Sequence, residues 1–342
     1  MNNQKHYQKR LSLIPKNNQT ASKDIAHLPG IPPTYIKSAK GACMETECGK
    51  TLLDFGCALG PNILGYNNKK VNRAIKKQLK KGALFSLPTK IEYKLAKKIN
   101  SIIPNAEMAR FAKNGSDVVM GAIRIASFET GKSHIARFGY NGFSDRVAVA
   151  NNKNGIPEEL KGLIHEFEYN NPESLENILK THPCSCVLME PVALELPKGN
   201  FLQKVRELCD KYGALLIFDE IVSGFRMDLK GCQNLYGVNA DLITLGKSVS
   251  NGMPISILAG KAEYMKHLNG DVFFSMTFGG ETLSIASALA TIKELEKKDY
   301  NHLWKIGEML NSGIKEMAEN RNLRINLKGH PLRRTLSFDA SY

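Results

Sequence analysis

The stretch "ALLIFDEI" (214–221) decides the fold, because five apolar residues in a row are followed at once by two acids. Such an unbroken apolar run is typical of a strand buried on both faces at the centre of a sheet. Asp219 stands where the run stops. A carboxylate there is costly to bury unless it meets a positive partner, and capping the following turn is the alternative role. The stretch therefore predicts a central strand that ends at a charged group.

Similar runs of strand length alternate with helical patterns on both sides of this stretch. The runs are "RFAKNG" (110–115), "SHIARFG" (133–139), "SCVLMEP" (185–191), "ADLITLG" (240–246) and "SILAG" (256–260). This β-α-β-α-β alternation predicts an α/β fold with a mostly parallel central sheet flanked by helices on both faces. In such sheets, ligands bind beyond the carboxyl ends of the strands, so the polar residues at those ends share one location.

Lys247 stands at one of these strand ends, between Gly246 and Ser248. A Gly-Lys-Ser sequence can belong to a phosphate-binding loop, but that pattern requires a glycine at position 241, where the chain has Asp. A lysine that is partly desolvated at the mouth of a sheet has a lowered pKa and can attack a carbonyl group. We therefore interpret Lys247 as a lysine for covalent chemistry.

Two further segments suit the binding of a phosphate. Ser116 in "NGSD" (114–117) is a good N-cap, and the backbone N–H groups of a first helical turn attract anions. Thr277 precedes two glycines in "MTFGGETLS" (276–284), where a hydroxyl on a flexible loop can contact a phosphate. Each segment alone is equally typical of an ordinary turn.

The net charge of +14 raises the question of a nucleic-acid partner. Many lysines fall in "NNKKVNRAIKKQLKKG" (67–82) and "YKLAKKIN" (93–100), where Val71, Ile75 and Leu79 keep helical spacing. The charges therefore indicate the solvated faces of amphipathic helices, and no nucleic-acid partner is predicted.

No membrane segment and no metal site are predicted either. No apolar run approaches the roughly 20 residues that cross a bilayer, and no apolar segment follows the basic start of the chain, so a cytoplasmic protein is expected. The seven cysteines form no C-x-x-C pair, which favours reduced thiols over a disulfide or a zinc site.

With Lys247 and Asp219 assembled, the sequence resembles the class III aminotransferases of the fold-type I pyridoxal-phosphate (PLP) enzymes, in particular the glutamate-1-semialdehyde aminotransferase-like branch. Their separation, 247 − 219 = 28 residues, is similar to the family's. The matching segments lie in order between about residues 28 and 295. They include "KNGSDVVMGAIRIA" (113–126), "GYNGFSD" (139–145), "FDEIVSGFR" (218–226), "ADLITLGKSVSNGMP" (240–254) and "TFGGETLSIASALAT" (277–291).

The resemblance implies a division of the chain into four parts. They are an irregular, proline-containing N-terminal arm (1–35), the N-terminal part of a small domain (36–80), a large PLP-binding domain (81–295) and the start of a C-terminal small domain (296–342). The family continues beyond the point where this chain ends, so the last part looks truncated. Arginines that bind a substrate carboxylate often lie in the missing part, and Arg333 and Arg334 are poor substitutes for them.

The resemblance also assigns roles around the cofactor ring. Lys247 would hold PLP as an internal aldimine, a Schiff base, and move protons between the substrate carbon and the cofactor. Asp219 would pair with the pyridine nitrogen, which keeps the ring an electron sink. Tyr140 would stack on one face of the ring and Ile221 would press on the other. Asn141 replaces the usual His beside the aromatic residue.

The resemblance assigns the binding of the cofactor phosphate to Gly115 and Ser116, together with Thr277 from a neighbouring subunit. That role implies a homodimer with shared active sites. Asp117 replaces the usual Glu after Gly-Ser, and Val222 stands where many ω-aminotransferases have a Gln.

The resemblance predicts an aminotransferase that moves an amino group from an amino donor to a small or sugar-like aldehyde or ketone. Glu195 in "EPVALE" (190–195) lies where ω-aminotransferases often carry a gating Glu that contacts substrate, and the "EPVAGN" typical of glutamate-1-semialdehyde aminomutases is absent. Two alternatives stay open: that aminomutase activity, which is an intramolecular amino exchange, and a truncated PLP-binding protein with little turnover.

Overall fold

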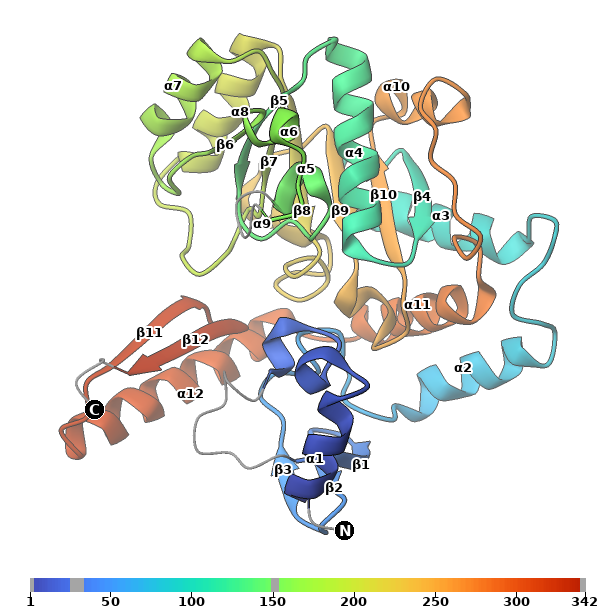
Figure 1. Ribbon diagram of the computed structural model, residues 1–342, viewed down its shortest axis with the longest axis vertical. Coiled ribbons are helices and arrows are strands. Elements are labelled where there is room, and N and C mark those ends of the chain that lie inside the picture. The colour runs from blue at the N-terminus through green and yellow to red at the C-terminus, as the bar shows by residue number, and fades with distance from the viewer. Residues whose placement is uncertain (1–2, 25–33, 149–153, 339–342) are drawn as a thin grey trace.

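The computed structural model describes residues 3–24, 34–148 and 154–338. Its centre is a seven-stranded sheet in the order β4-β10-β9-β8-β7-β5-β6 (Figure 1). The strands are β4 (Met108–Ala112), β5 (His134–Phe138), β6 (Ile164–Glu166), β7 (Cys184–Met189), β8 (Leu215–Glu220), β9 (Leu242–Leu245) and β10 (Ser256–Gly260). Strand β10 is antiparallel to β4 and β9, and the remaining pairs are parallel. The predicted mostly parallel sheet is confirmed.

Strand β8 is central, as its unbroken apolar sequence predicts. It lies between β7 and β9, and all of its residues are buried. Leu216 and Phe218 pack into one apolar cluster, whereas Leu215 and Ile217 pack into another on the opposite face. This alternation follows from the period of two in a strand, and it sends Asp219 and Glu220 to opposite faces of the sheet.

Helices cover both faces of the sheet, as predicted (Figure 1). The helix α4 (Gly115–Thr130) contributes Val118, Ala122 and Ile125 to one apolar cluster. The other cluster draws on four helices: α3 (Lys90–Ile102), α7 (Pro172–Thr181), α8 (Phe201–Tyr212) and α11 (Thr282–Leu295). Short helices fill the connections: α5 (Asp145–Ala148), α6 (Glu158–Lys161), α9 (Gly231–Tyr236) and α10 (Ala262–Met265).

The lysine-rich segment forms α2 (Lys69–Leu79), which packs against α11. Val71 is buried and Ile75 is half-buried, while Lys76 and Lys77 are exposed, so the predicted solvated face is confirmed. Leu79 departs from the prediction because its side chain is exposed at the end of the helix. Within the part of the chain that the structure describes, no helix combines the length and apolar character needed to cross a membrane.

The remaining elements come from the two ends of the chain and lie beside the sheet-containing part (Figure 1). They are α1 (Asn3–Leu11), an antiparallel sheet of β1 (Ile36–Lys40), β2 (Cys43–Thr46) and β3 (Thr51–Leu53), and α12 (Tyr300–Asn320) followed by a hairpin of β11 (Ile325–His330) and β12 (Arg333–Phe338). The expectation of an irregular arm is wrong for α1, because the prolines begin only at Pro15 and leave 3–11 free to form a helix. The other arm prolines, at positions 29, 32 and 33, lie outside the described residues. The division into four parts stays a prediction.

Candidate active site

Four parallel strands bring polar side chains to their carboxyl ends, as the sequence predicts. Tyr140 and Asn141 follow β5, Glu190 follows β7, Asp219 lies near the end of β8, and Lys247 follows β9. The amide Nδ2 of Asn141 donates a hydrogen bond to Oδ2 of Asp219 at 2.9 Å. Residues 78 positions apart in the chain therefore meet at one site.

Asp219 is a buried carboxylate with three hydrogen bonds. Besides Asn141, Oγ1 of Thr244 and the backbone N–H of Ile221 each donate to its Oδ1 at 3.2 Å. Burial raises the pKa of Asp219, and the nearby Glu190 carboxylate raises it further, against the three hydrogen bonds that lower it. Asp219 therefore caps the turn after β8, and among the described residues no lysine or arginine forms an ion pair with its carboxylate, although Lys247 lies near enough to feel its charge.

The amide of Asn141 is itself incompletely paired. The residue is 2% exposed, and its Oδ1 is buried without a hydrogen-bond partner among the described residues. Buried polar atoms without a partner are rare in folded proteins, and one beside an acid is a common sign of a binding site.

Lys247 is half-buried at the same edge and has an unusual backbone conformation. Its φ of 40° lies in the left-handed region, which costs a residue other than glycine free energy. Burial lowers the pKa of its ammonium group, and the charges of Arg333 and Arg226 lower it further, whereas Asp219 and Glu190 raise it. A lysine with a lowered pKa is uncharged more often and is therefore a better nucleophile.

A loop from the N-terminal part of the chain covers Lys247. The position of a Cβ on Gly60 would lie 3.4 Å from Cδ of Lys247. The carbonyl oxygen of Gly60 accepts hydrogen bonds from Oγ of Ser248, at 3.3 Å, and from the guanidinium of Arg226. These contacts hold the loop against the lysine and limit the access of water to it.

Glycines allow close packing between the start of α4 and the segments that follow β5 and β9. Cβ atoms on Gly115 and Gly246 would lie 3.3 and 3.0 Å from the side chain of Ile221, which sits between them. A Cβ on Gly142, whose φ is 104°, would lie 2.4 Å from Oγ of Ser116. Only glycine fits at position 142, so the backbone approaches the helix start closely.

Ser116 lies in the first turn of α4, while Asn114 and Asp117 form the capping box of that helix. The N-cap predicted at Ser116 is therefore Asn114. The hydroxyl of Ser116 accepts a hydrogen bond from the backbone N–H of Phe143 at 3.1 Å, which ties the segment after β5 to the helix start. Backbone N–H groups at the start of a long helix remain available to an anion.

The other predicted site residues lie around this cluster. Tyr140 is 62% exposed, and its backbone N–H donates to Oε1 of Glu190 at 3.0 Å. Thr277 is exposed and lines an open cavity together with Ser116. Glu195 is exposed in the loop between β7 and α8, and among the described residues no hydrogen bond or ion pair joins it to Lys247 or Asp219. The structure thus gathers the candidates with the exception of Glu195.

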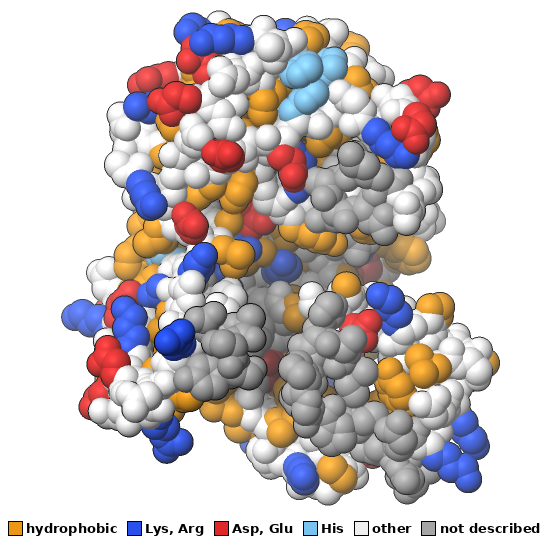
Figure 2. All heavy atoms as spheres, turned by 60° about the vertical axis from the view of Figure 1, so that its left-hand side comes forward, with side chains coloured by type: hydrophobic (Ala, Val, Ile, Leu, Met, Phe, Trp, Pro, Cys, Tyr) orange, Lys and Arg blue, Asp and Glu red, His pale blue; other side chains and the backbone are white. Residues whose placement is uncertain are grey.

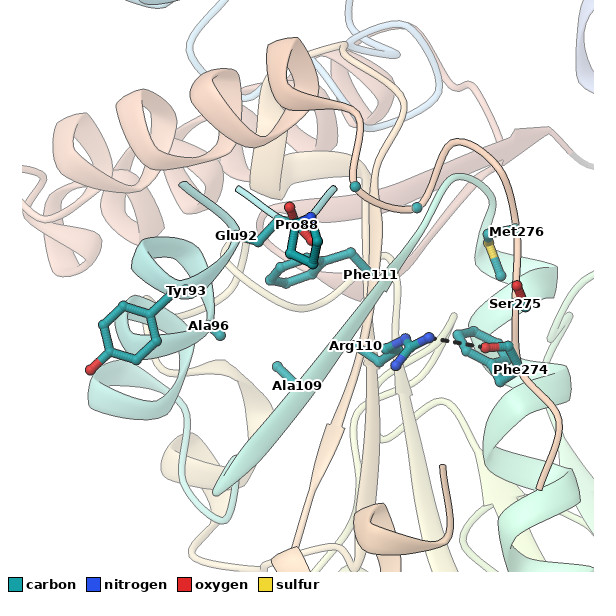
Figure 3. Close-up of a pocket in the computed structure, with 12 residues that line it drawn as sticks. Pro88, Glu92, Tyr93, Ala96, Ala109, Arg110, Phe111, Phe274, Ser275 and Met276 are labelled. Atoms are coloured by element: carbon teal, nitrogen blue, oxygen red, sulfur yellow. Dashed lines mark hydrogen bonds between the residues drawn. The ribbon is translucent and has the colours of Figure 1, made fainter. Parts of the chain in front are cut away.

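Segment 273–280 separates that cavity from a second one. Figure 3 shows the second cavity, where Tyr93 and Glu92 lie on one side, Arg110 crosses from β4, and Phe274 and Met276 close the other side. Nη2 of Arg110 donates to the carbonyl oxygen of Phe274 at 3.3 Å. The segment is therefore fixed to the sheet edge by its backbone, which leaves the side chain of Thr277 exposed.

Sequence reasoning gave no role to the ion pair between Glu190 and Arg333. Nη1 of Arg333, on β12, lies 2.6 Å from Oε2 of Glu190 and donates to the carbonyl oxygen of Val192 at 2.8 Å. Glu190 is 6% exposed. The C-terminal hairpin thereby places a guanidinium beside the site, at a position that the sequence alone made a poor candidate for substrate binding.

Comparisons with known proteins agree with this geometry. The aminotransferase class-III family model matches residues 28–330. The chain is 36% identical over 335 residues to the 3-aminobutyryl-CoA aminotransferase of Cloacimonas acidaminovorans (strain Evry), covering 95% of this chain and 80% of that protein. It is 35% identical over 311 residues to the glutamate-1-semialdehyde 2,1-aminomutase of Methanococcus maripaludis (strain C6), covering 85% and 73%.

A solved structure matches nearly the whole fold. The PLP internal aldimine form of the FumI protein of Sphingopyxis sp. MTA144 superposes with a TM-score of 0.93 at 25% identity, over 99% of this chain and 83% of that one. The match extends over the sheet, the helices and the end segments, so the architecture described above is that of a known PLP enzyme.

Proposed function

The chain belongs to the class III aminotransferases, a family of PLP-dependent enzymes, and we propose that it transfers an amino group from an amino donor to a small or sugar-like aldehyde or ketone. The observation that carries this proposal is the presence, at one sheet edge, of a half-buried lysine of lowered pKa, Lys247, and a buried acid, Asp219, that forms no ion pair among the described residues.

The residues at this edge fit PLP. The buried Asp219 suits a protonated pyridine nitrogen, which would form an ion pair with its carboxylate. Ile221 packs against Gly115 and Gly246 and is thereby held beside the start of α4, where it can contact a flat ring, and the start of α4 suits a phosphate. When bound, PLP withdraws electrons from the substrate and thereby stabilises negative charge on the substrate carbon.

The chain's own residues would supply the rest of the chemistry. Nζ of Lys247 would hold the cofactor through its aldehyde group and would remove and return the proton at the substrate carbon. Asp219 would hold the ring nitrogen in its protonated form, and Asn141 and Thr244 would fix the direction of the Asp219 carboxylate. Tyr140 and Ile221 would contact the two faces of the ring.

Phosphate binding is proposed for Gly115 and Ser116, with Thr277 supplied by a second copy of the chain. Exposed aromatic side chains surround the mouth of the site: Tyr140, Phe143, Phe273 and Phe278 are 62%, 74%, 77% and 56% exposed. Apolar surface of this kind usually marks an interface, which supports a homodimer.

The acceptor is the least constrained part of the proposal. Identity to the Methanococcus aminomutase supports glutamate-1-semialdehyde as an alternative substrate, with the amino group exchanged within one molecule. The sequence "EPVALE" (190–195) departs from the pattern typical of those aminomutases and favours a separate donor and acceptor. The second alternative is a PLP-binding protein with little turnover. A cytoplasmic location stays a prediction.

The test is an amino-transfer half-reaction. The purified PLP-loaded protein is titrated with glutamate and then with alanine while its visible absorbance is followed, and 2-oxo acid release is measured. We expect the visible absorbance band of the PLP-loaded protein to disappear as one equivalent of 2-oxo acid per chain is released. An absorbance band that no amino donor changes would favour a binding protein with little turnover. Conversion of glutamate-1-semialdehyde by the protein without release of a 2-oxo acid would favour the aminomutase.

A further inference from the structure

Three histidines meet at the amino end of the central sheet. His134 is the first residue of β5, His165 is the middle residue of β6, and His182 directly follows α7. One ring nitrogen from each lies within 4.8 Å of the other two. Within residues 3–24, 34–148 and 154–338, this is the one group of three or more potential metal ligands, and all three side chains are partly exposed.

The sheet register dictates this meeting. His165 stands opposite Ala136 in the parallel pair of β5 and β6, so it faces the same side of the sheet as His134, two residues before Ala136. Nδ1 of His134 and Nε2 of His165 are 2.9 Å apart. The ring of His182 stacks on that of His165 with centroids 3.7 Å apart. The exposed histidine patch is visible in pale blue on the upper part of Figure 2.

The cluster is separate from the candidate active site. Tyr140 and Asn141 follow the carboxyl end of β5, whereas His134 begins that strand. Five strand residues at about 3.3 Å each place the two sites about 15 Å apart or more. The amino-transfer chemistry therefore makes no use of these rings.

Their surroundings suit a cation better than added protons. Nδ1 of His134 and Nε2 of His165 share one hydrogen bond, so at least one of these two nitrogens is unprotonated. Among the described residues, the histidine ion pairs belong to His267, and no carboxylate forms one with any of the three rings. Uncharged imidazoles keep a lone pair free for a metal ion.

We propose that His134, His165 and His182 form a binding site for a divalent transition-metal ion of the Zn²⁺ type, with water as the fourth ligand. Zn–N bonds of about 2.0–2.1 Å in a tetrahedron put the ligand nitrogens about 3.4 Å apart. This spacing lies between the 2.9 Å from Nδ1 of His134 to Nε2 of His165 and the 4.8 Å within which all three ligand nitrogens lie. The ring of His182 must turn out of its stack on His165, because a metal ion lies in the plane of each ring that binds it.

Three neutral nitrogen ligands select the kind of ion. Imidazole suits Zn²⁺, Ni²⁺ and Cu²⁺, whereas Mg²⁺ and Ca²⁺ require oxygen ligands. A bound ion would join β5, β6 and the segment after α7, and would thereby stabilise this end of the sheet. The cysteine spacing predicted no metal site, and the three histidines, 31 and 17 residues apart, form no local metal-binding pattern.

The test measures Zn²⁺ binding to the PLP-loaded protein by calorimetry and by the shift in Tm, with Mg²⁺ as the comparison ion. We expect one Zn²⁺ per chain, a higher Tm with Zn²⁺ only, and a loss of affinity of about tenfold or more in His165→Gln and in His182→Gln. The control is His302→Gln, which changes an exposed histidine of α12.

Two further measurements keep the result decisive. Melting curves without metal show whether each variant folds. If His165→Gln does not fold, His182→Gln still tests the proposal. Co²⁺ substitution should give visible d–d bands without the thiolate charge-transfer band that one of the seven cysteines would add. Equal Zn²⁺ affinity in all variants, or a Co²⁺ spectrum dominated by thiolate, would overturn the proposal.

Discussion

Asp219 and Glu220 are consecutive residues at the end of β8, and both side chains are buried, yet they lie in different regions of the molecule. Asp219 faces the α4 side of the sheet, where Asn141, Thr244 and Lys247 gather. Glu220 faces the opposite side, where it accepts hydrogen bonds from Oγ of Ser223 at 3.1 Å and from the backbone N–H of Cys232 at 2.8 Å. The alternation of a strand thus separates a site acid from its neighbour.

The two regions also differ in what they leave open. Around Asp219, Lys247 is half-buried and Tyr140 is exposed, so a ligand can reach the site from the surface. Around Glu220, a Cβ on Gly231 would come within 2.8 Å of the carboxylate, so the pocket is closed. Burial raises the pKa of Glu220 to about 7, and its Oε1 has no hydrogen-bond partner among the described residues. A buried acid with a raised pKa is therefore not by itself a sign of function; access from the surface matters as well.

The largest expected effect follows from replacing the acid on the open side. Asp219→Asn keeps the shape of the side chain and removes its charge. The pyridine ring of the cofactor would then lose the anion that keeps its nitrogen protonated. We expect the rate of the glutamate half-reaction to fall about a thousandfold, equivalent to about 4 kcal/mol. Stopped-flow absorbance measures this rate, and a fall of less than threefold would contradict the role of Asp219.

The matched change on the closed side, Glu220→Gln, should act on stability instead. The folded-state pKa of about 7 lies above the unfolded value of 4.5, so wild-type stability falls as pH rises from about 4.5 to above 7. The full loss is on the order of 3 kcal/mol. Glu220→Gln cannot ionise and should flatten that decline, which urea unfolding at pH 5 and pH 8 would detect. The half-reaction rate should stay within a few-fold of wild type.

A smaller effect is expected from the groups that orient Asp219. Asn141→Ala removes one hydrogen bond from the buried carboxylate, and such a loss costs about 1–3 kcal/mol. We expect the half-reaction to slow about tenfold. Thr244→Val is the matched control on the other carboxylate oxygen and should have a similar or smaller effect. No change in either variant would mean that Asp219 is oriented by the backbone alone.

The smallest expected effect comes from the ion pair at the rim of the site. The charge of Arg333 lowers the pKa of Lys247, and Glu190 raises it. Arg333→Gln removes the positive charge that lowers the pKa of Lys247 and leaves the carboxylate of Glu190 without its ion pair. The pKa of Lys247 should therefore rise. The pH dependence of covalent PLP attachment should then move to higher pH. A shift to lower pH would show that Arg333 does not act on the lysine through its charge.

The two regions also show what the sequence could and could not predict. Strands β7, β8, β9 and β10 were predictable because burial on both faces favours runs that are mostly apolar. Strands β4 and β5 contain Arg110 and Arg137, and they were predictable from their place in the alternation of strands and helices. Strand β6 was missed because its three residues, Ile164–Glu166, carry a single apolar side chain. The hairpin of β11 and β12 was missed as well, because its strands are largely exposed and lack a buried run.

Within the site, the residues at strand ends were predictable because parallel strands end at one edge. Lys247, Asp219 and Asn141 are examples, and a direct hydrogen bond joins the last two. The pairing of Glu190 with Arg333 depends on how a hairpin 143 residues away docks, which no local pattern reveals. The three histidines likewise come together through sheet register alone.

The most direct test of the central claim is to identify the lysine that carries the cofactor. The protein is loaded with PLP, reduced with borohydride and digested, and the modified peptide is found by mass spectrometry. The account predicts one modified peptide, containing Lys247, in the wild type, in Glu220→Gln and in a control with the exposed lysine replaced, Lys230→Ala, and none in Lys247→Ala. Modification of a different lysine in the wild type, or an unchanged yield in Lys247→Ala, would contradict it.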